Sequence, residues 1–237
     1  MYHSRIDGSS RPLAPDAAAE RVTAFLRKVY GWMAAGLAIT ALVALQVAAS
    51  PAVIGYLVSN QFLFLGLTLA EVGVVFFVSA RADRLAPSAA TALFVTYAAL
   101  NGVTLSFVLL AYTGESVAST FMVTAGTFGA MAVFGSTTTR RLAGVGQFLY
   151  MGVFGLLLAS LVGLFWHNDA LQFVISAVGV LVFTGLAAWD AQRLKQMALA
   201  VPAGQARAFA IVGALALYLD FVNLFLFLLR FLGGRRD

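Results

Sequence analysis

The sequence predicts an all-α polytopic membrane protein with seven transmembrane helices. Apolar residues make up 61% of the 237 residues and charged residues only 11%, whereas about a quarter of a typical soluble domain is charged. Seven apolar stretches are each about 20 residues long, which is the length that a helix needs to cross a bilayer. Most charges and all five prolines fall outside these stretches.

The chain divides into a polar tail and a membrane domain. Residues 1–27 mix charged side chains with prolines, so we expect a short polar tail on the cytoplasmic side, and residues 28–234 form the membrane domain. Pro51, Pro87 and Pro202 separate spans, where a proline breaks no helix. In chain order, the expected spans cover residues 29–49, 61–80, 88–112, 117–137, 145–166, 171–190 and 208–232.

Lysine and arginine fall on alternate connections, which orients the spans. The three connections at residues 50–60, 112–117 and 166–171 contain neither residue. The basic segments contain Arg5, Arg11, Arg21, Arg27 and Lys28 in the tail, then Arg81 and Arg84, Arg140 and Arg141, and Arg193, Lys195 and Arg207. We therefore expect a cytoplasmic N-terminus and, after seven crossings, an external C-terminus. Arg235 and Arg236 oppose this bias, so a last segment that enters and returns on one side is the alternative.

Composition also excludes several kinds of site. The chain has no cysteine, so it has no disulfide and no thiolate metal site. No phosphate-binding loop, histidine-rich metal motif or nucleophile elbow occurs. The net charge of +5 follows from the basic loops facing anionic lipid and requires no nucleic acid. We interpret Gly126, Gly129, Gly152 and Gly155 as sites where helices pack closely.

Polar residues inside the last apolar stretch need an explanation. Asp220, Asn223 and Arg230 are spaced by three and seven residues, which places them on one stripe of a helix. A carboxylate at the bilayer centre costs about 2.5–3.5 kcal/mol on insertion scales. The stripe should therefore face protein or water, and Asp220 should have a partner or a proton.

Asp190, near the end of the sixth span, has two interpretations. It could be a solvated charge at the end of a helix, offset by Arg193 one turn later. Alternatively it meets Asp220, because the two aspartates lie at similar distances from the turn that Pro202 and Gly204 predict. In a water-poor site, repulsion and desolvation would then retain one proton between the carboxyl groups. Such a pair could be a proton sensor and gate, or a structural hydrogen bond between helices.

Three more residues are candidates near this pair. Glu71 lies in the middle of the second span and bears the same insertion cost as Asp220, so it is a candidate for an ion pathway, as are Asn223 and Arg230. Arg81 closes the second span on the side of Asp190 and either pairs with it or anchors the helix end. Asn101 and Thr104 share a face of the third span, which is typical of helix packing.

Two segments resemble a known family. The run from Leu215 to Gly233, LALYLDFVNLFLFLLRFLG, follows the segment WDAQRLK at residues 189–195. Together they resemble the signature of the transmembrane Bax-inhibitor-motif family in its bacterial branch. Residues 29–33 and 118–131 are also similar to the bacterial members.

The resemblance implies a fold, a location and a mechanism. The last of seven helices would be central and surrounded by the other six, in a bacterial inner membrane. Some members of the family are pH-sensitive calcium leak channels in which two aspartates share a proton and an arginine acts as a latch. By motif, these residues correspond to Asp190, Asp220 and Arg81.

The leading functional hypothesis is a passive pathway for Ca²⁺, gated by protonation of Asp190 and Asp220 and lined by Glu71. Calcium takes oxygen ligands, which this chain offers, and the two aspartates could bind it in transit. No resident cofactor is expected. The partners on this view are the lipid bilayer and cations.

Two other classes of protein compete with the ion-pathway hypothesis. A regulatory protein would bind and modulate a membrane-bound quality-control protease, as some bacterial relatives do, and its aspartates would be structural. An intramembrane aspartyl protease would need Gly-x-Gly before its second aspartate, but Leu217, Tyr218 and Leu219 precede Asp220. We therefore expect that the protein is not an enzyme.

Overall fold

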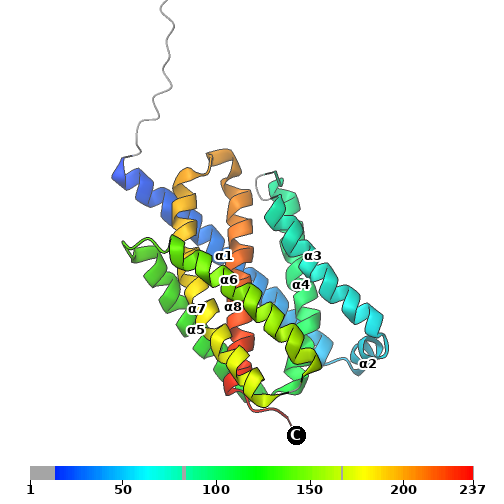
Figure 1. The fold of residues 1–237 in the computed structure, drawn as a ribbon. Coiled ribbons are helices and arrows are strands. Elements are labelled where there is room, and N and C mark those ends of the chain that lie inside the picture. Colours follow the sequence, from blue (N-terminus) through cyan, green and yellow to red (C-terminus); the bar gives the residue numbers. More distant parts are fainter. Residues whose placement is uncertain (1–13, 82–83, 167, 237) are drawn as a thin grey trace, which may run out of the picture.

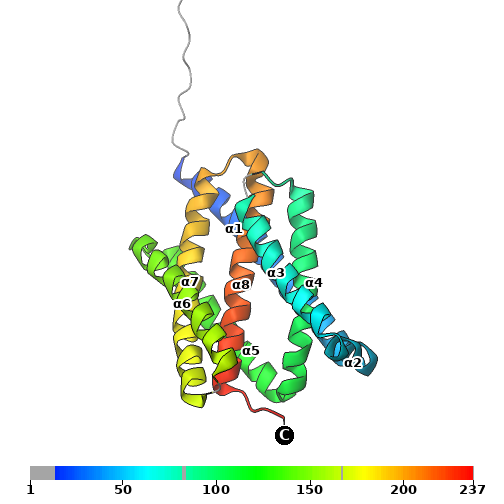
Figure 2. The same ribbon diagram turned by 45° about the vertical axis from the view of Figure 1, so that its right-hand side comes forward.

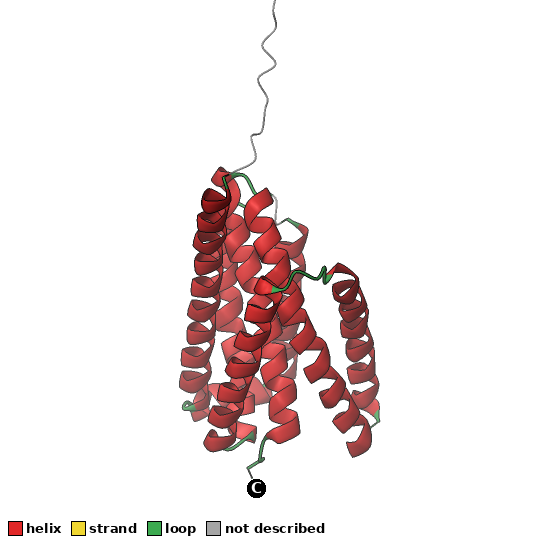
Figure 3. Ribbon diagram, turned by 90° about the vertical axis from the view of Figure 1, so that its left-hand side faces the viewer, coloured by secondary structure: helices red, strands yellow, loops and turns green. Residues whose placement is uncertain are grey.

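The computed structural model describes residues 14–81, 84–166 and 168–236, and in these ranges the chain is helical with short connections (Figure 3). Seven of the eight α-helices are long and apolar enough to cross a membrane, which confirms the predicted class and number of spans. The elements are α1 Pro15–Ala48, α2 Pro51–Ser59, α3 Gln61–Ala80, α4 Pro87–Ala111, α5 Gly114–Thr137, α6 Ala143–Phe165, α7 Asp169–Ala200, the 3₁₀ turn η1 Ala203–Gln205, and α8 Ala206–Leu232.

Three helices differ from the sequence-based boundaries. Helix α1 begins at Pro15, so half of the expected polar tail is helical, while residues 1–13 lie outside the described part of the chain. Helix α2 fills the connection at residues 51–59, with Pro51 in its first turn, where the missing N–H costs nothing. Helix α7 continues ten residues past Asp190. Hydropathy detects the part of a helix that suits lipid, and polar residues such as Gln192 extend the same helix beyond that part.

Helix α8 is the centre of the bundle. In its most apolar window 67% of the residues are buried, against at most 39% in any other span. It packs chiefly against α1, α4, α5 and α7, while α3 packs outside α4 and α6 outside α7 (Figure 2). The expected central last helix is confirmed, with four of its neighbours in direct contact and two in an outer position.

The last helix crosses the whole bundle. The described start of α1 and the α7–α8 turn lie at one end, and the C-terminus lies at the other (Figure 1). Beyond α8, the Arg236 amide donates to the Ala111 carbonyl, and the Thr113 amide donates to the Gly234 carbonyl. These bonds tie the end of α8 to the α4–α5 connection. The segment is one continuous helix of 27 residues that does not turn back on itself.

One of the four glycines expected at close helix contacts lies at one: a Cβ on Gly152 would lie 3.1 Å from the Val182 side chain. A Cβ atom on Gly135 would lie 1.9 Å from the Ala188 carbonyl oxygen, so α5 and α7 touch through their backbones. At Gly126, Gly129 and Gly155 a Cβ would meet nothing within 4 Å. The expectation of close packing was therefore wrong for these three glycines, because a small residue permits a close approach only where a neighbouring helix crosses.

Candidate functional site

Asp190 of α7 and Asp220 of α8 meet in the middle of the bundle. Asp190 is 3% exposed and Asp220 is 5% exposed, and their carboxyl groups lie close enough for a hydrogen bond between them. Two carboxyl groups can form such a bond only when at least one of them carries a proton, because a carboxylate has no donor. The Oδ2 atom of Asp220 is buried and has no hydrogen-bond partner among the described residues. A bond between the two carboxyl groups would therefore need a proton, at a site with little other polar compensation.

Arg193 connects this buried pair to the surface. Its Nη1 atom lies 3.7 Å from Oδ1 of Asp190, and its side chain is 50% exposed. The guanidinium lies over the Trp189 ring at 5.3 Å and close to the hydroxyl of Tyr150 of α6. Tyr150 in turn packs edge-on against Trp189 with ring centroids 5.3 Å apart. The rings of Trp189 and Tyr150 thus position the Arg193 guanidinium between Asp190 and the surface.

The same segment of α7 also fixes the α5–α6 connection. Gln192 is buried; its Nε2 donates to the Arg140 carbonyl and its Oε1 accepts from the Leu142 amide, both at 2.8 Å. Lys195 donates to the Ser136 carbonyl at 2.7 Å. The segment at 189–195 therefore has two structural roles. One face of the helix carries Asp190, and another carries Gln192 and Lys195, which bind the α5–α6 connection.

Arg81 does not pair with Asp190 in this structure. It caps α3, its side chain is exposed, and its guanidinium lies over the Phe77 ring at 5.3 Å. Among the described residues the cation beside Asp190 is Arg193. Of the two interpretations of Arg81, the structure agrees with the helix-end position and not with the pairing, because α3 packs on the outside of α4, away from α7.

The predicted polar stripe on α8 divides into three environments. Asp220 is buried, whereas Asn223 is half-buried and donates to the Leu219 carbonyl of its own helix at 2.8 Å. Arg230 is exposed in the last turn and lies over the Phe227 ring at 5.9 Å. Only Asp220 is fully enclosed by protein, and the exposed position of Arg230 is compatible with the expectation that the stripe faces protein or water.

A second polar cluster lies on the opposite side of α8. Glu71 of α3 accepts hydrogen bonds from Asn101 at 3.3 Å and from Thr104 at 3.0 Å, both on α4. Tyr218 of α8 donates to the Asn101 amide oxygen at 2.9 Å and contacts Thr40 of α1 at 2.7 Å. Tyr218 and Asp220 are two residues apart, which places them about 200° apart around the helix. Glu71 therefore belongs to a site separate from the aspartate pair.

The hydroxyl groups of Thr40 and Tyr218 make three polar contacts but carry only two hydrogens. Thr40 donates to the Ala98 carbonyl at 2.8 Å, Tyr218 donates to Asn101, and the two hydroxyls also contact each other, which needs three hydrogens from two hydroxyls. The three contacts share two hydrogens, so they are not all hydrogen bonds at the same moment.

Sequence reasoning missed Tyr218, Thr40 and Tyr150. Their side chains are amphipathic or small, so they carry no hydropathy signal inside an apolar span. The position of Tyr218 two residues before Asp220 places it on the opposite face of the helix, but its partners on α1 and α4 are far away in the chain.

We expect Tyr218→Phe to lower the free energy of unfolding by about 1 kcal/mol, the usual size of such a hydrogen bond in a membrane protein. Removal of the Tyr218 hydroxyl leaves the buried Asn101 oxygen without its donor. Thermal unfolding in detergent measures the change in stability. Tyr56→Phe is the matched control, because Tyr56 is 62% exposed. Equal melting temperatures for the two variants would contradict the role of Tyr218.

The described residues contain no group of three or more His, Cys, Asp or Glu side chains suited to a metal ion. Calcium takes six to eight oxygen ligands, so two carboxyl groups are too few for a resident ion.

The chain is similar to known membrane proteins over nearly its whole length. Residues 22–237 match the family model described as "Inhibitor of apoptosis-promoting Bax1". The inner membrane protein YbhL of Escherichia coli K12 is 46% identical over 215 residues, which cover 90% of this chain and 92% of YbhL. A Deinococcus radiodurans protein is 46% identical over 219 residues, covering 92% of this chain and 93% of its own, and a Borreliella burgdorferi protein is 43% identical over 215 residues, covering 90% and 93%.

Proposed function

Because the chain belongs to the family of inhibitors of apoptosis-promoting Bax1, we propose that it is a cation leak pathway whose flux is controlled by the proton that Asp190 and Asp220 share. The proposed ion is Ca²⁺. We further propose that the protein lies in the bacterial inner membrane with a cytoplasmic N-terminus, as the distribution of basic residues predicts.

The observation that carries the proposal is the close approach of two buried carboxyl groups on different helices. With a proton present, a hydrogen bond between them joins α7 to α8. When the proton leaves, two adjacent carboxylates repel each other in a weakly screened environment and attract cations. Loss of the proton therefore favours separation of the helices and passage of a cation, so flux should rise with pH.

Arg193 is proposed as the counter-ion of this gate, in place of Arg81. A positive charge 3.7 Å from Asp190 favours the ionised pair. We expect Arg193→Gln to move the pH midpoint of Ca²⁺ flux in proteoliposomes to a higher value, because the pair then keeps its proton to higher pH. Arg81→Gln removes the same charge from an exposed position and should leave the midpoint unchanged. If only Arg81→Gln shifts the midpoint, Arg81 is the latch that the family resemblance implies.

Glu71 is proposed as a separate point on the ion pathway. Its carboxylate is partly exposed and lies on the other side of α8 from the aspartate pair. We expect Glu71→Gln to reduce the rate of flux without changing its pH midpoint, because it removes an oxygen anion but leaves the pair intact. A shifted midpoint would instead place Glu71 in the gate.

The second candidate function is regulation of a membrane-bound quality-control protease. One observation favours it: the first turns of α1 carry exposed charged side chains, including Asp16, Glu20 and Arg27, ahead of the expected span. Deletion of residues 1–20 should then abolish capture of the protease in a pull-down and leave ion flux intact. Retention of the protease by the truncated chain would exclude residues 1–20 as the contact.

A further inference from the structure

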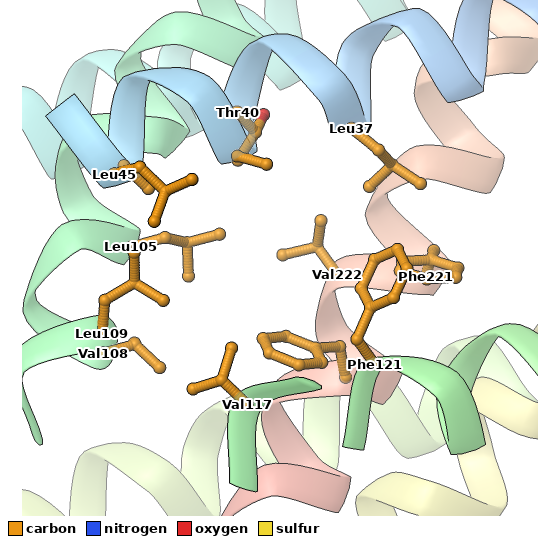
Figure 4. Close-up of a pocket in the computed structure, with 13 residues that line it drawn as sticks. Leu37, Thr40, Leu45, Leu105, Val108, Leu109, Val117, Phe121, Phe221 and Val222 are labelled. Carbon is orange, nitrogen blue, oxygen red and sulfur yellow. The ribbon is translucent and has the colours of Figure 1, made fainter. Parts of the chain in front are cut away.

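We propose that a cavity between α1, α4, α5 and α8 binds the acyl chain of a membrane phospholipid. The cavity has a volume of about 190 Å³. Its walls come from Ala44 of α1, Leu105 of α4, Val117 and Phe121 of α5, and Val222 of α8. Figure 4 shows the side chains of Leu105, Val117 and Val222 around the open space. This inference does not depend on the proposed function.

The lining selects an apolar ligand. Thr40 is the one polar residue among the thirteen that line the cavity, and its hydroxyl is already bonded to Ala98 and Tyr218. A polar or charged group placed here would lose its hydration without gaining a hydrogen bond. The ligand must therefore be a hydrocarbon along the whole length that enters.

The packing of the helices opens the cavity toward lipid. Helices α1 and α4 pack against each other and against α8, while α5 packs against α7 and α8, so the cavity lies where α5 diverges from the first pair. At its edge Leu45 is 58% exposed and Phe121 is 43% exposed, whereas Ala44 and Val222 inside are 3% and 6% exposed. Around membrane-spanning helices, the molecules that meet such an edge are lipids, and their apolar parts are acyl chains.

The size of the cavity is sufficient for a chain segment to enter. An apolar cavity of about 150 Å³ in a soluble protein stays dry and binds benzene. A void leaves the lining side chains without contacts on one side, and a methylene chain restores these contacts. The occupant would touch Phe221 and Val222, the two residues that follow Asp220 on the central helix.

Photo-crosslinking of the full chain in vesicles tests the proposal. The probe is a phosphatidylethanolamine with a diazirine in the middle of one acyl chain, and adducts are mapped by peptide mass spectrometry after irradiation. We expect adducts on the buried residues Ala44 and Val222 as well as on exposed Met122, which is 70% exposed and reports lipid at the outer surface. Adducts on exposed residues alone would overturn the proposal.

Two filling variants provide the specificity control. Ala44→Phe and Val117→Phe fill the cavity from opposite walls, so each should reduce labelling of Val222 to the level of an unirradiated sample and leave labelling of Met122 unchanged. Ala130→Phe adds the same ring at an exposed position of α5 and should change neither. Gel filtration checks that each filling variant is folded. If one variant is misfolded, the labelling is measured on the other. Unchanged labelling of Val222 in a folded filling variant would show that the chain does not occupy this cavity.

Discussion

Asp220→Asn should abolish the pH response of Ca²⁺ flux. In the wild type, a gate controlled by one shared proton changes its open population by up to about tenfold per pH unit on one side of its midpoint. The asparagine amide has nearly the same shape as the carboxyl group but keeps its hydrogens at every pH, so it donates to Asp190 whether or not protons are abundant. The bond between α7 and α8 then persists, and flux should remain at its low-pH level.

The measurement is Ca²⁺ entry into proteoliposomes across a series of pH values, with equal pH on both sides of the membrane. Glu115→Gln is the matched control, because it removes one exposed carboxylate and should keep the wild-type response. Equal flux and equal pH dependence in wild type and Asp220→Asn would exclude the gating model. The carboxyl pair would then be a structural hydrogen bond, which was the other interpretation of the sequence.

Gly135→Ala should destabilise the fold by about 1–3 kcal/mol, the usual cost of overpacking. The added methyl group would fall 1.9 Å from the Ala188 carbonyl oxygen. Because backbone of α7 cannot yield as a side-chain tip can, α5 and α7 must move apart. Ala188 lies two residues before Asp190, so this crossing also sets where the aspartate is held.

Thermal unfolding in detergent checks this result. Gly126→Ala is the control on the same helix: a Cβ there meets nothing within 4 Å, and alanine favours a helix by up to about 1 kcal/mol over glycine. The two substitutions should therefore have opposite effects on the melting temperature. A melting temperature for Gly135→Ala at or above that of the wild type would show that the crossing is loose.

The two predictions depend on different kinds of information. The pattern of residues in the last two spans singled out Asp220 without any structure, because a carboxylate in an apolar stretch is costly wherever it points. Gly135 could not be distinguished from Gly126 by sequence. Both occupy the same apolar helix, and only the position of α7 makes one of them indispensable.

The sequence by itself determined the class of the fold, the number of spans, the family and the candidate status of Asp190, Asp220 and Glu71. These follow from length, hydropathy and local motifs, which act within one helix. Hydropathy failed where a helix continues past the apolar part, as α1 does before residue 29 and α7 does after Asp190, and where α2 fills an expected connection.

Only the tertiary structure decided the partners. It placed Arg193 beside Asp190 and left Arg81 at the surface, separated Glu71 from the aspartate pair by joining it to Asn101 and Tyr218, and exposed Arg230. The physical reason is that the contacts of a side chain depend on the crossing angles and rotational orientations of helices that are distant in sequence. Those crossings depend on the packing of small and large side chains from several helices at once, which no single segment of the chain encodes.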